Sequence, residues 1–230
     1  MKRTPPAQMS ETVRLGAVLA AAGGFLDAYT YLTRGGVFAN AQTGNIVLLG
    51  GYLAQGQFRT AGRYLIPILA FAAGVIVAEL IKARFRYHPA LHWRQITVGA
   101  EVAILAAVAF LPQRWNVPAN LAVSFVCAMQ VESFRKIRGN TYATTMCTGN
   151  LRSATELLFR CCRSGGRCER EQCLQYYGII LFFACGAALG ALFCRSLGER
   201  AVLLACLLLA AAFLLMFRNG ETRGRGRGKA

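Results

Sequence analysis

Two acidic residues, Asp27 and Glu132, interrupt long apolar stretches of the sequence and are the first candidates for chemistry. A carboxylate at membrane depth costs roughly 2.5 to 3.5 kcal/mol on insertion scales, so it normally faces the protein interior or a water-filled cavity. The chemistry that this placement favours is the binding of a proton or a cation. The alternative is structural: each acid caps a broken helix or pairs with a nearby arginine, Arg34 or Arg135.

A repeated triplet, Thr43-Gly44-Asn45 and Thr148-Gly149-Asn150, is the second candidate. Threonine is a common N-cap, so the triplets predict the starts of two half-helices. The free N–H groups and positive dipole end of such a helix can bind an anionic or carbonyl oxygen. Neighbouring residues could add neutral hydrogen-bonding groups to this substrate- or ion-binding set; they are Asn40, Gln42, Thr144 and Thr145. Alternatively, these side chains only satisfy backbone groups that a break exposes.

The elements that must position these residues are membrane helices. The chain has 230 residues, of which 55% are hydrophobic and 16% charged, against roughly a quarter charged in soluble domains. Apolar runs of about 18 to 20 residues match the thickness of a bilayer. We predict an all-α polytopic membrane protein with six spans, at 15–33, 64–81, 95–111, 117–134, 176–193 and 201–217. Segments 35–55 and 139–160 are interrupted by polar residues and glycine, which predicts broken or re-entrant elements.

The basic residues predict the orientation. Twenty of the 26 Lys and Arg residues fall in segments that share one side if the N-terminus is cytoplasmic. The other side holds six, namely Arg34, Arg59, Arg63, Arg114, Arg195 and Arg200. This positive-inside bias predicts that both termini are cytoplasmic. A cleaved signal peptide at the first span is the alternative, which the apolar continuation through Leu32 disfavours.

The two halves of the chain resemble each other. Residues 17–48 align without a gap with 122–153, which pairs Asp27 with Glu132 and Thr43 with Thr148. After a seven-residue insertion, segments 64–81 and 176–193 share seven identities in 18 positions. Because each half has three spans, the second copy enters the membrane inverted. We therefore predict repeats at 1–111 and 112–217, followed by a basic flexible tail at 218–230, with a central site between the repeats.

Small residues at four-residue spacing occur in both halves, as Gly74 with Ala78 and Gly186 with Gly190. Such pairs allow two helix backbones to approach closely, so they predict helix contacts. Glu79 and Glu101 lie in the second and third spans without an acidic counterpart in the other half, and pairing with Lys82 is the favoured role for Glu79.

Four cysteines cluster in a segment that is predicted to be cytoplasmic: Cys161, Cys162, Cys168 and Cys173. We expect no disulfide framework there. The spacing also lacks the paired C-x2-C pattern of zinc sites, so we expect no cofactor, although a metal or redox role is the alternative. The Arg-Gly tail at 223–229 resembles an RNA-binding segment in composition. Beside a membrane helix, however, it favours anionic lipid head groups, and we expect no nucleic-acid partner.

Three segments resemble the YoaK family of bacterial membrane proteins: Gly23-Gly24-Phe25-Leu26-Asp27-Ala28, Gly35-Gly36-Val37-Phe38 and Gln42-Thr43-Gly44-Asn45-Ile46-Val47-Leu48-Leu49-Gly50. The resemblance covers nearly the whole chain and implies a multi-pass inner-membrane protein with about six spans. The family's usual serine before Gly-Asn is Thr43 here, which keeps the hydroxyl. The resemblance brings no established substrate, cofactor or catalytic residue.

The function that these features predict is a small transporter or channel-like permease for an unknown small solute, with proton coupling through Asp27 and Glu132. The alternative is a non-transporting scaffold or regulatory subunit that acts through the cysteine-rich loop and the basic tail. We do not expect an enzyme, because no metalloprotease motif, nucleophile elbow or phosphate loop is present. The expected partners are lipid, a small solute or proton and, as an open question, further copies of the chain.

Overall fold

The computed structural model describes residues 13–86, 93–137, 140, 141, 145, 147–164 and 167–218. In this part of the chain, the first half forms α1 (Val13–Thr33), α2 (Gln42–Ala54), α3 (Phe58–Phe85) and α4 (Trp93–Val108). The second half forms α5 (Asn116–Ser133), α6 (Cys147–Ser164), α7 (Arg167–Leu197) and α8 (Val202–Arg218). Two short 3-10 helices, η2 (Gln113–Trp115) and η3 (Gly198–Ala201), precede α5 and α8. The predicted all-α class is confirmed; a strand pair of two residues each, β1 (Lys136–Ile137) and β2 (Asn140–Thr141), is a minor addition.

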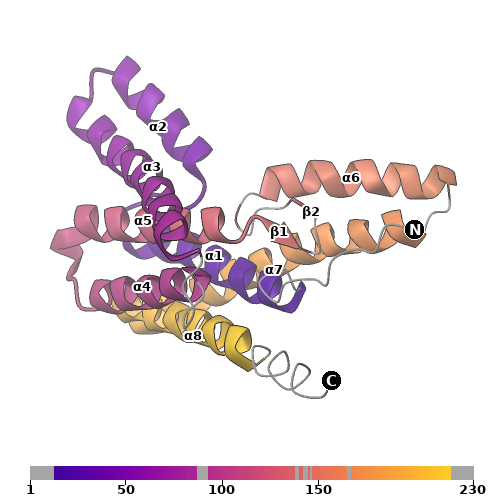
Figure 1. The fold of residues 1–230 in the computed structure, drawn as a ribbon. Coiled ribbons are helices and arrows are strands. Elements are labelled where there is room, and N and C mark those ends of the chain that lie inside the picture. Colours follow the sequence, from indigo (N-terminus) through magenta and orange to yellow (C-terminus); the bar gives the residue numbers. More distant parts are fainter. Residues whose placement is uncertain are drawn as a thin grey trace.

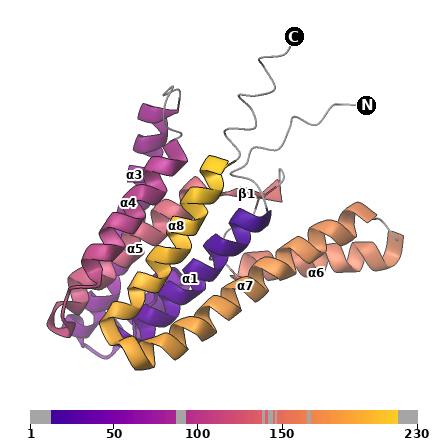
Figure 2. The same cartoon turned by 90° about the horizontal axis from the view of Figure 1, so that it is seen from below.

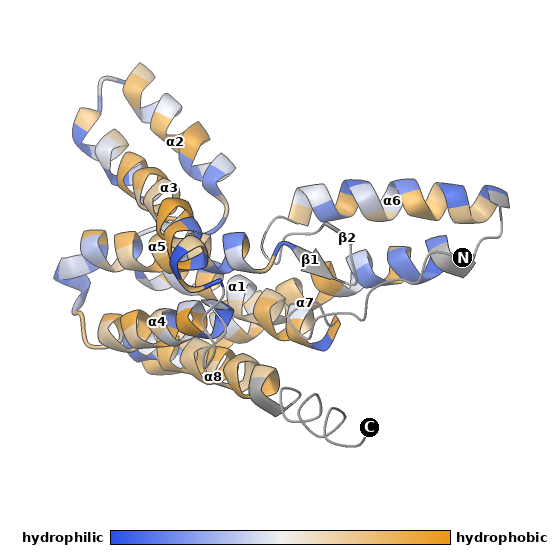
Figure 3. Ribbon diagram, in the orientation of Figure 1, coloured by the Kyte–Doolittle hydropathy of each residue, from blue (hydrophilic) through white to orange (hydrophobic). Residues whose placement is uncertain are grey.

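The apolar runs become long helices with apolar outer surfaces. Each of the six predicted spans overlaps one helix, in order α1, α3, α4, α5, α7 and α8. Among the described residues, three helical stretches are long and apolar enough to cross a membrane: Val13–Thr33, Phe58–Phe85, and Glu169–Met216, which runs through α7 and α8. Helix α4 has 16 residues and so extends about 24 Å, less than a hydrocarbon core of about 30 Å. Large apolar side chains such as Ile76 and Leu181 remain exposed, as lipid-facing residues do, and orange covers most of α3, α4, α7 and α8 in Figure 3.

The helices pack in pairs that join the two halves (Figures 1 and 2). Helix α1 packs along α7, and α5 packs along α3. Helix α1 also contacts α8, as α5 contacts α4, and α4 contacts α8. Helix α2 folds back on α3 and α6 on α7, and these two hairpins point away from the bundle in different directions in Figure 1.

Glycines set how closely the paired helices approach. A Cβ on Gly24 would overlap the carbonyl of Phe183, and one on Gly186 would overlap the carbonyl of Ala21. At the α3–α5 crossing, a Cβ on Gly74 would overlap the carbonyl of Phe125. The close helix contact predicted from the small-residue spacing is therefore confirmed in both pairs.

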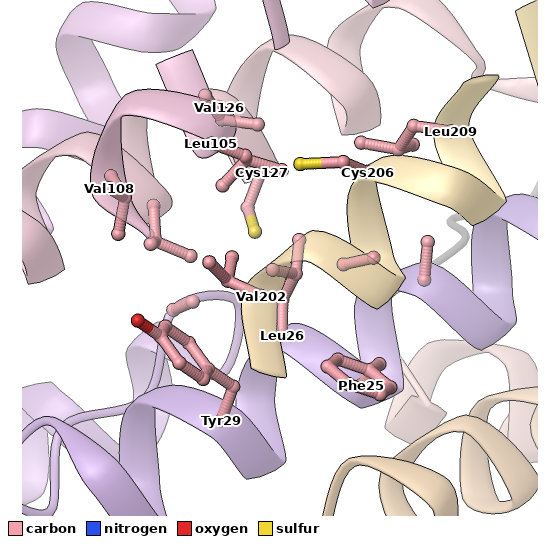
Figure 4. Packing of buried hydrophobic residues seen from close by; sticks show 14 of the residues in the cluster. Phe25, Leu26, Tyr29, Leu105, Val108, Val126, Cys127, Val202, Cys206 and Leu209 are labelled. Carbon is pink, nitrogen blue, oxygen red and sulfur yellow. The ribbon is translucent and has the colours of Figure 1, made fainter. Parts of the chain in front are cut away.

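The main core lies between α1, α4, α5 and α8 (Figure 4). Its side chains point inward from all four helices and include Phe25, Leu26, Tyr29, Leu105, Val108, Val126, Cys127, Val202, Cys206 and Leu209. Because α1 and α4 come from the first half and α5 and α8 from the second, neither half completes this core alone.

Candidate functional site

Helix α1 ends at a glycine pair, and the chain then turns back toward it. Gly35 and Gly36 have φ angles of +87° and +75°, a left-handed backbone that L side chains rarely adopt. The Gly36 N–H donates to the carbonyl of Tyr31 at 3.1 Å, which closes the end of the helix. The chain is non-helical until α2 begins at Gln42, so the break predicted near the start of segment 35–55 lies at residues 34–41.

Asp27 bonds the backbone of the non-helical segment just before α2. Its Oδ1 accepts a hydrogen bond from the backbone N–H of Asn40 at 2.7 Å, and the N–H groups of Ala39 and Ala41 also face this carboxyl. A carboxylate at a helix N-terminus is favoured by the free N–H groups and by the dipole. Asp27 therefore holds the backbone that leads into α2.

Thr43 does not cap α2, contrary to the prediction from the Thr-Gly-Asn triplet. The N-cap position belongs to Ala41, whose side chain cannot accept a hydrogen bond, and Thr43 is exposed in the first helical turn beside half-buried Gly44. The prediction was wrong because α2 begins one residue before Thr43, at Gln42, and the backbone ahead of it is bonded instead by Asp27 from the preceding helix.

The amide side chains of the break mainly satisfy its backbone. Asn45 is buried and spans Phe38: its Nδ2 donates to the Phe38 carbonyl at 2.8 Å, and its Oδ1 accepts from the Phe38 N–H at 3.2 Å. Gln42 donates through Nε2 to the carbonyl of Ala39 at 2.8 Å. These bonds match the structural interpretation of Gln42 and Asn45 and hold the non-helical segment in one shape.

Residues from both breaks meet beside Gly23 on α1. Asn40 Nδ2 donates to the Gly23 carbonyl at 3.1 Å, and the methyl group of Thr145 lies against Gly23 so closely that a Cβ there would overlap it. Asn40 and Thr145 occupy matching positions in the alignment of the two halves. Asn40 Oδ1 and Thr145 Oγ1 are buried and have no hydrogen-bond partner in the part of the chain that the structure describes. We call Asp27, Asn40 and Thr145 the polar centre.

The second triplet lies at the start of α6. The helix begins at Cys147, so Thr148 lies inside its first turn rather than before it, and Thr148 and Gly149 are exposed. Asn150 is buried, as Asn45 is in the first half. The Cys147 thiol lies within electrostatic range of the Asp27 carboxyl, so the beginnings of α2 and α6 both approach this acid. Thr144 lies outside the described residues.

Glu132 occupies different surroundings from its sequence counterpart Asp27. It forms an ion pair with Arg135 at 3.1 Å and shares a hydrogen bond with Glu79, which in turn pairs with Lys82 at 2.6 Å. Both ion pairs were among the structural alternatives in the sequence. In the described part of the chain, no hydrogen bond or ion pair joins Glu132 to Asp27.

Glu101 is the acid for which the sequence suggested no clear role. It lies in the middle of α4, is fully buried, and neither carboxyl oxygen has a hydrogen-bond partner among the described residues. The thiol of Cys127 on α5 lies within electrostatic range of both Glu101 and Asp27, and Asn40 also contacts it. The signal in the sequence was an acid flanked on both sides by apolar turns of one helix.

Arg34 ties the first break to the far end of α4. It is fully buried, and its guanidinium donates to the carbonyls of Leu111 at 2.8 Å and Val108 at 3.1 Å and to the Tyr29 hydroxyl at 2.8 Å. The C-terminal carbonyls of a helix attract a cation. Arg34 therefore caps the C-terminal end of α4, a role that the sequence did not predict because that end lies more than 70 residues further on.

The cysteine cluster shows a packed thiol and two more accessible ones. Cys173 is buried and donates to the Ala154 carbonyl at 3.4 Å, whereas Cys161 is half-buried and Cys162 exposed. No group of three or more potential metal ligands occurs among the described residues. The side chain of Cys168 and the basic tail from residue 219 lie outside them.

The chain belongs to a family whose model, described as "Protein of unknown function (DUF1275)", matches residues 15–215. It is also 29% identical over 146 residues to the UPF0700 transmembrane protein YoaK of Bacillus subtilis (strain 168), an alignment that covers 61% of this chain and 64% of the relative. No solved structure matches the chain. The resemblance to the YoaK family is confirmed, and the chain is a membrane protein of that family.

Proposed function

We propose that the protein is a small proton-coupled permease whose solute site is the polar centre. The observation that carries this assignment is the meeting of both breaks beside Gly23, where Asn40 Oδ1 and Thr145 Oγ1 are buried without hydrogen-bond partners in the described part of the chain. Buried polar oxygens are normally hydrogen-bonded, so this pair is suited to accept hydrogen bonds from a bound solute. Asp27 is adjacent and supplies a group that can gain or lose a proton.

The pairing of the helices supports two inverted halves. Exchanging α1 with α5, α2 with α6, α3 with α7 and α4 with α8 turns each main packed pair into another that is also present: α1–α7 becomes α5–α3, and α1–α8 becomes α5–α4. Transporters with this symmetry place broken helices at a midplane site. We therefore propose six crossings of the bacterial inner membrane, with both termini in the cytoplasm as the positive-inside count predicts.

The acid that accompanies Asp27 in this mechanism is Glu101 rather than Glu132. Glu101 and Asp27 both lie within electrostatic range of Cys127 in the interior, whereas Glu132 is paired locally with Arg135. A carboxylate without a partner is costly at membrane depth, which makes Glu101 suited to carry a proton. Loss of the proton from either acid would change the charge of the interior and so bias which side the halves open to.

The test is solute-driven current in protein reconstituted into liposomes, recorded on concentration jumps of phosphate, small carboxylates and amino acids. We expect at least one solute to give a current that Asp27→Asn or Glu101→Gln lowers at least tenfold. Glu156→Gln, an exposed acid on α6, is the matched control and should leave the current unchanged. Full currents in both interior variants, with the fold checked by circular dichroism, would contradict the mechanism.

We propose no catalytic step for this chain. Its proposed partners are the solute, the proton and the surrounding lipid, with anionic head groups at the basic tail. We make no proposal for the oligomeric state.

A second candidate function is a scaffold or regulatory subunit, which the surface of α6 favours. This helix exposes Leu158 and Phe159 together with charged Arg160, a combination suited to a partner protein or a membrane surface. Deletion of residues 161–173 or of the tail at 219–230 should then abolish function in the native host while Asp27→Asn is tolerated. The permease requires the opposite result.

A further inference from the structure

A cavity of about 630 Å³ opens between the start of α3 and the segment that leads into α5. Its polar lining consists of Arg59, Thr60, Arg63, Gln113, Arg114 and Asn116. Sites for small molecules usually have volumes of roughly 300 to 1,000 Å³, so this cavity has room for a solute or a lipid head group.

The cavity carries three positive charges without a counter-ion. Arg59, Arg63 and Arg114 all line it, no acidic residue does, and none of the three takes part in an ion pair within the described part of the chain. Three guanidinium groups around one space repel one another, and an anion between them would relieve that repulsion. Arginine also matches the oxygens of phosphate with paired N–H donors.

Other groups reinforce the positive potential. The first residues of α3 and α5 both line the cavity, so the positive dipole ends of a 28-residue and an 18-residue helix face it. Asn116 Oδ1 accepts from buried Arg34 at 3.4 Å, which leaves its Nδ2 as a donor. Arg63 Nη2 lies 2.8 Å from where a Cβ on Gly35 would be, so the cavity adjoins the break that follows α1.

The predicted orientation places the three cavity arginines on the side opposite the cytoplasm. Only six basic residues fall on the side opposite the cytoplasm, and three of them line this one cavity. Basic residues on that side act against the positive-inside bias, so topology does not explain them.

We propose that the cavity binds a phosphate group, carried either by a soluble solute or by the head group of an anionic lipid, through Arg59, Arg63 and Arg114. Exposed Phe58 and Val117 at the rim would contact the apolar part of such a ligand. This binding does not depend on transport through the polar centre. It can be measured on purified protein even if that protein transports no solute.

The experiment is calorimetric titration of the full chain, purified in an uncharged detergent, with sodium phosphate at constant ionic strength. We expect saturable binding that the double variant Arg63→Gln/Arg114→Gln weakens at least tenfold, because two charge-assisted contacts are lost. The matched control is Arg195→Gln/Arg200→Gln, which removes two exposed charges from the same predicted side and should change the affinity less than twofold. If the double variant fails to fold, the exposed Arg59→Gln should still weaken binding about threefold.

A second arm distinguishes the two sources of phosphate. The same proteins are tested for retention of phosphatidylglycerol against phosphatidylcholine by native mass spectrometry. Retention of phosphatidylglycerol that is lost in the double variant, without binding of free phosphate, assigns the cavity to lipid. Failure of the wild-type chain to bind either probe, or equal weakening in the cavity and control variants, would overturn the proposal.

Discussion

The two breaks start alike and then diverge. After α1, a backbone hydrogen bond to Asp27 and side-chain hydrogen bonds from Gln42 and Asn45 fix the non-helical segment, and the 13-residue α2 that follows has no charged residue. After α5, the matching acid is paired with Arg135, and the 18-residue α6 carries Arg152, Glu156, Arg160 and Arg163. Figure 3 shows the same contrast, with more blue along α6 than along α2.

This difference shows that α2 and α6 can pack in the same way within their halves and still face different environments. Both helices fold back on the next long helix of their half, but only α2 has a surface suited to hydrocarbon. The charged α6 requires water or head groups. We infer that the first half supplies the polar centre and that the second half supplies one oxygen to it, from Thr145, and a wet surface.

The largest effect is expected at the glycine crossings. Gly24→Leu would drive a side chain into the Phe183 carbonyl and separate α1 from α7, so we expect a loss of more than about 4 kcal/mol or failure to fold. Gly50→Leu on α2 meets open space and should cost little. Thermal unfolding in detergent, followed by circular dichroism, measures both; equal midpoints would contradict the close crossing.

The second largest effect is expected at the arginines that follow α1 and α5, where replacing Arg34 should cost more stability than replacing Arg135. Arg34→Met leaves buried carbonyls of Val108 and Leu111 without their donor, at a cost of about 3 kcal/mol. Arg135→Met removes an exposed ion pair and should cost less than about 1 kcal/mol. The same unfolding measurement decides, and a larger loss for the Arg135 variant would reverse the comparison.

A lysine scan tests the environments of α2 and α6 directly. Val47 is 67% exposed on α2, and Val47→Lys should destabilise the inserted protein by about 2 kcal/mol if that surface faces hydrocarbon. Phe159 is 62% exposed on α6, and Phe159→Lys should change stability by less than about 0.5 kcal/mol. The readout is the fraction of chain that resists alkaline extraction from membranes. Equal tolerance at both positions would show that α2 also lies in water.

The smallest effect concerns the two acids. Asp27→Ala removes the acceptor for the Asn40 N–H just before α2 and should cost about 1 to 2 kcal/mol, with faster amide hydrogen exchange at residues 39–41. Glu132→Ala should leave exchange at the start of α6 unchanged, since its described partners are Arg135 and Glu79. Faster exchange at the start of α6 in the Glu132 variant would show that Glu132 contacts the backbone that leads into the following helix as Asp27 does, which contradicts this comparison.

Much of the fold follows from run length alone. An apolar run has few ways to satisfy its backbone in lipid other than a helix, so each predicted span overlaps a helix. The run at 176–193 understates α7, which begins at Arg167 because its polar first turns pack on α6. Residues that are helical because of such a tertiary contact are polar, so they do not extend the apolar run in the sequence.

The site was only partly predictable, because the partners come from distant positions. The sequence placed Asp27, Asn40 and Thr145 in one candidate binding set, and the structure joins Asn40 to Asp27 and brings Asn40 and Thr145 to Gly23. The alignment of the halves also equated Asp27 with Glu132, whereas the structure pairs Glu132 with Arg135, one of the two alternatives that the sequence left open. The bond between Asp27 and the backbone before α2 and the electrostatic proximity of Glu101 to Cys127 depend on how the chain folds back and how helices cross, which no pattern along one helix specifies.

The pairing of α1 with α7 has a consequence for how the chain is made. The glycine face of α1 is covered by a helix that leaves the ribosome some 150 residues later. During that interval α1 has only the contacts of its own half, including the bond from the Asn40 N–H to Asp27, and its closest neighbour is still to be synthesised. Membrane-insertion factors that bind incompletely assembled helices would thus act on this protein early, before its second half has been synthesised.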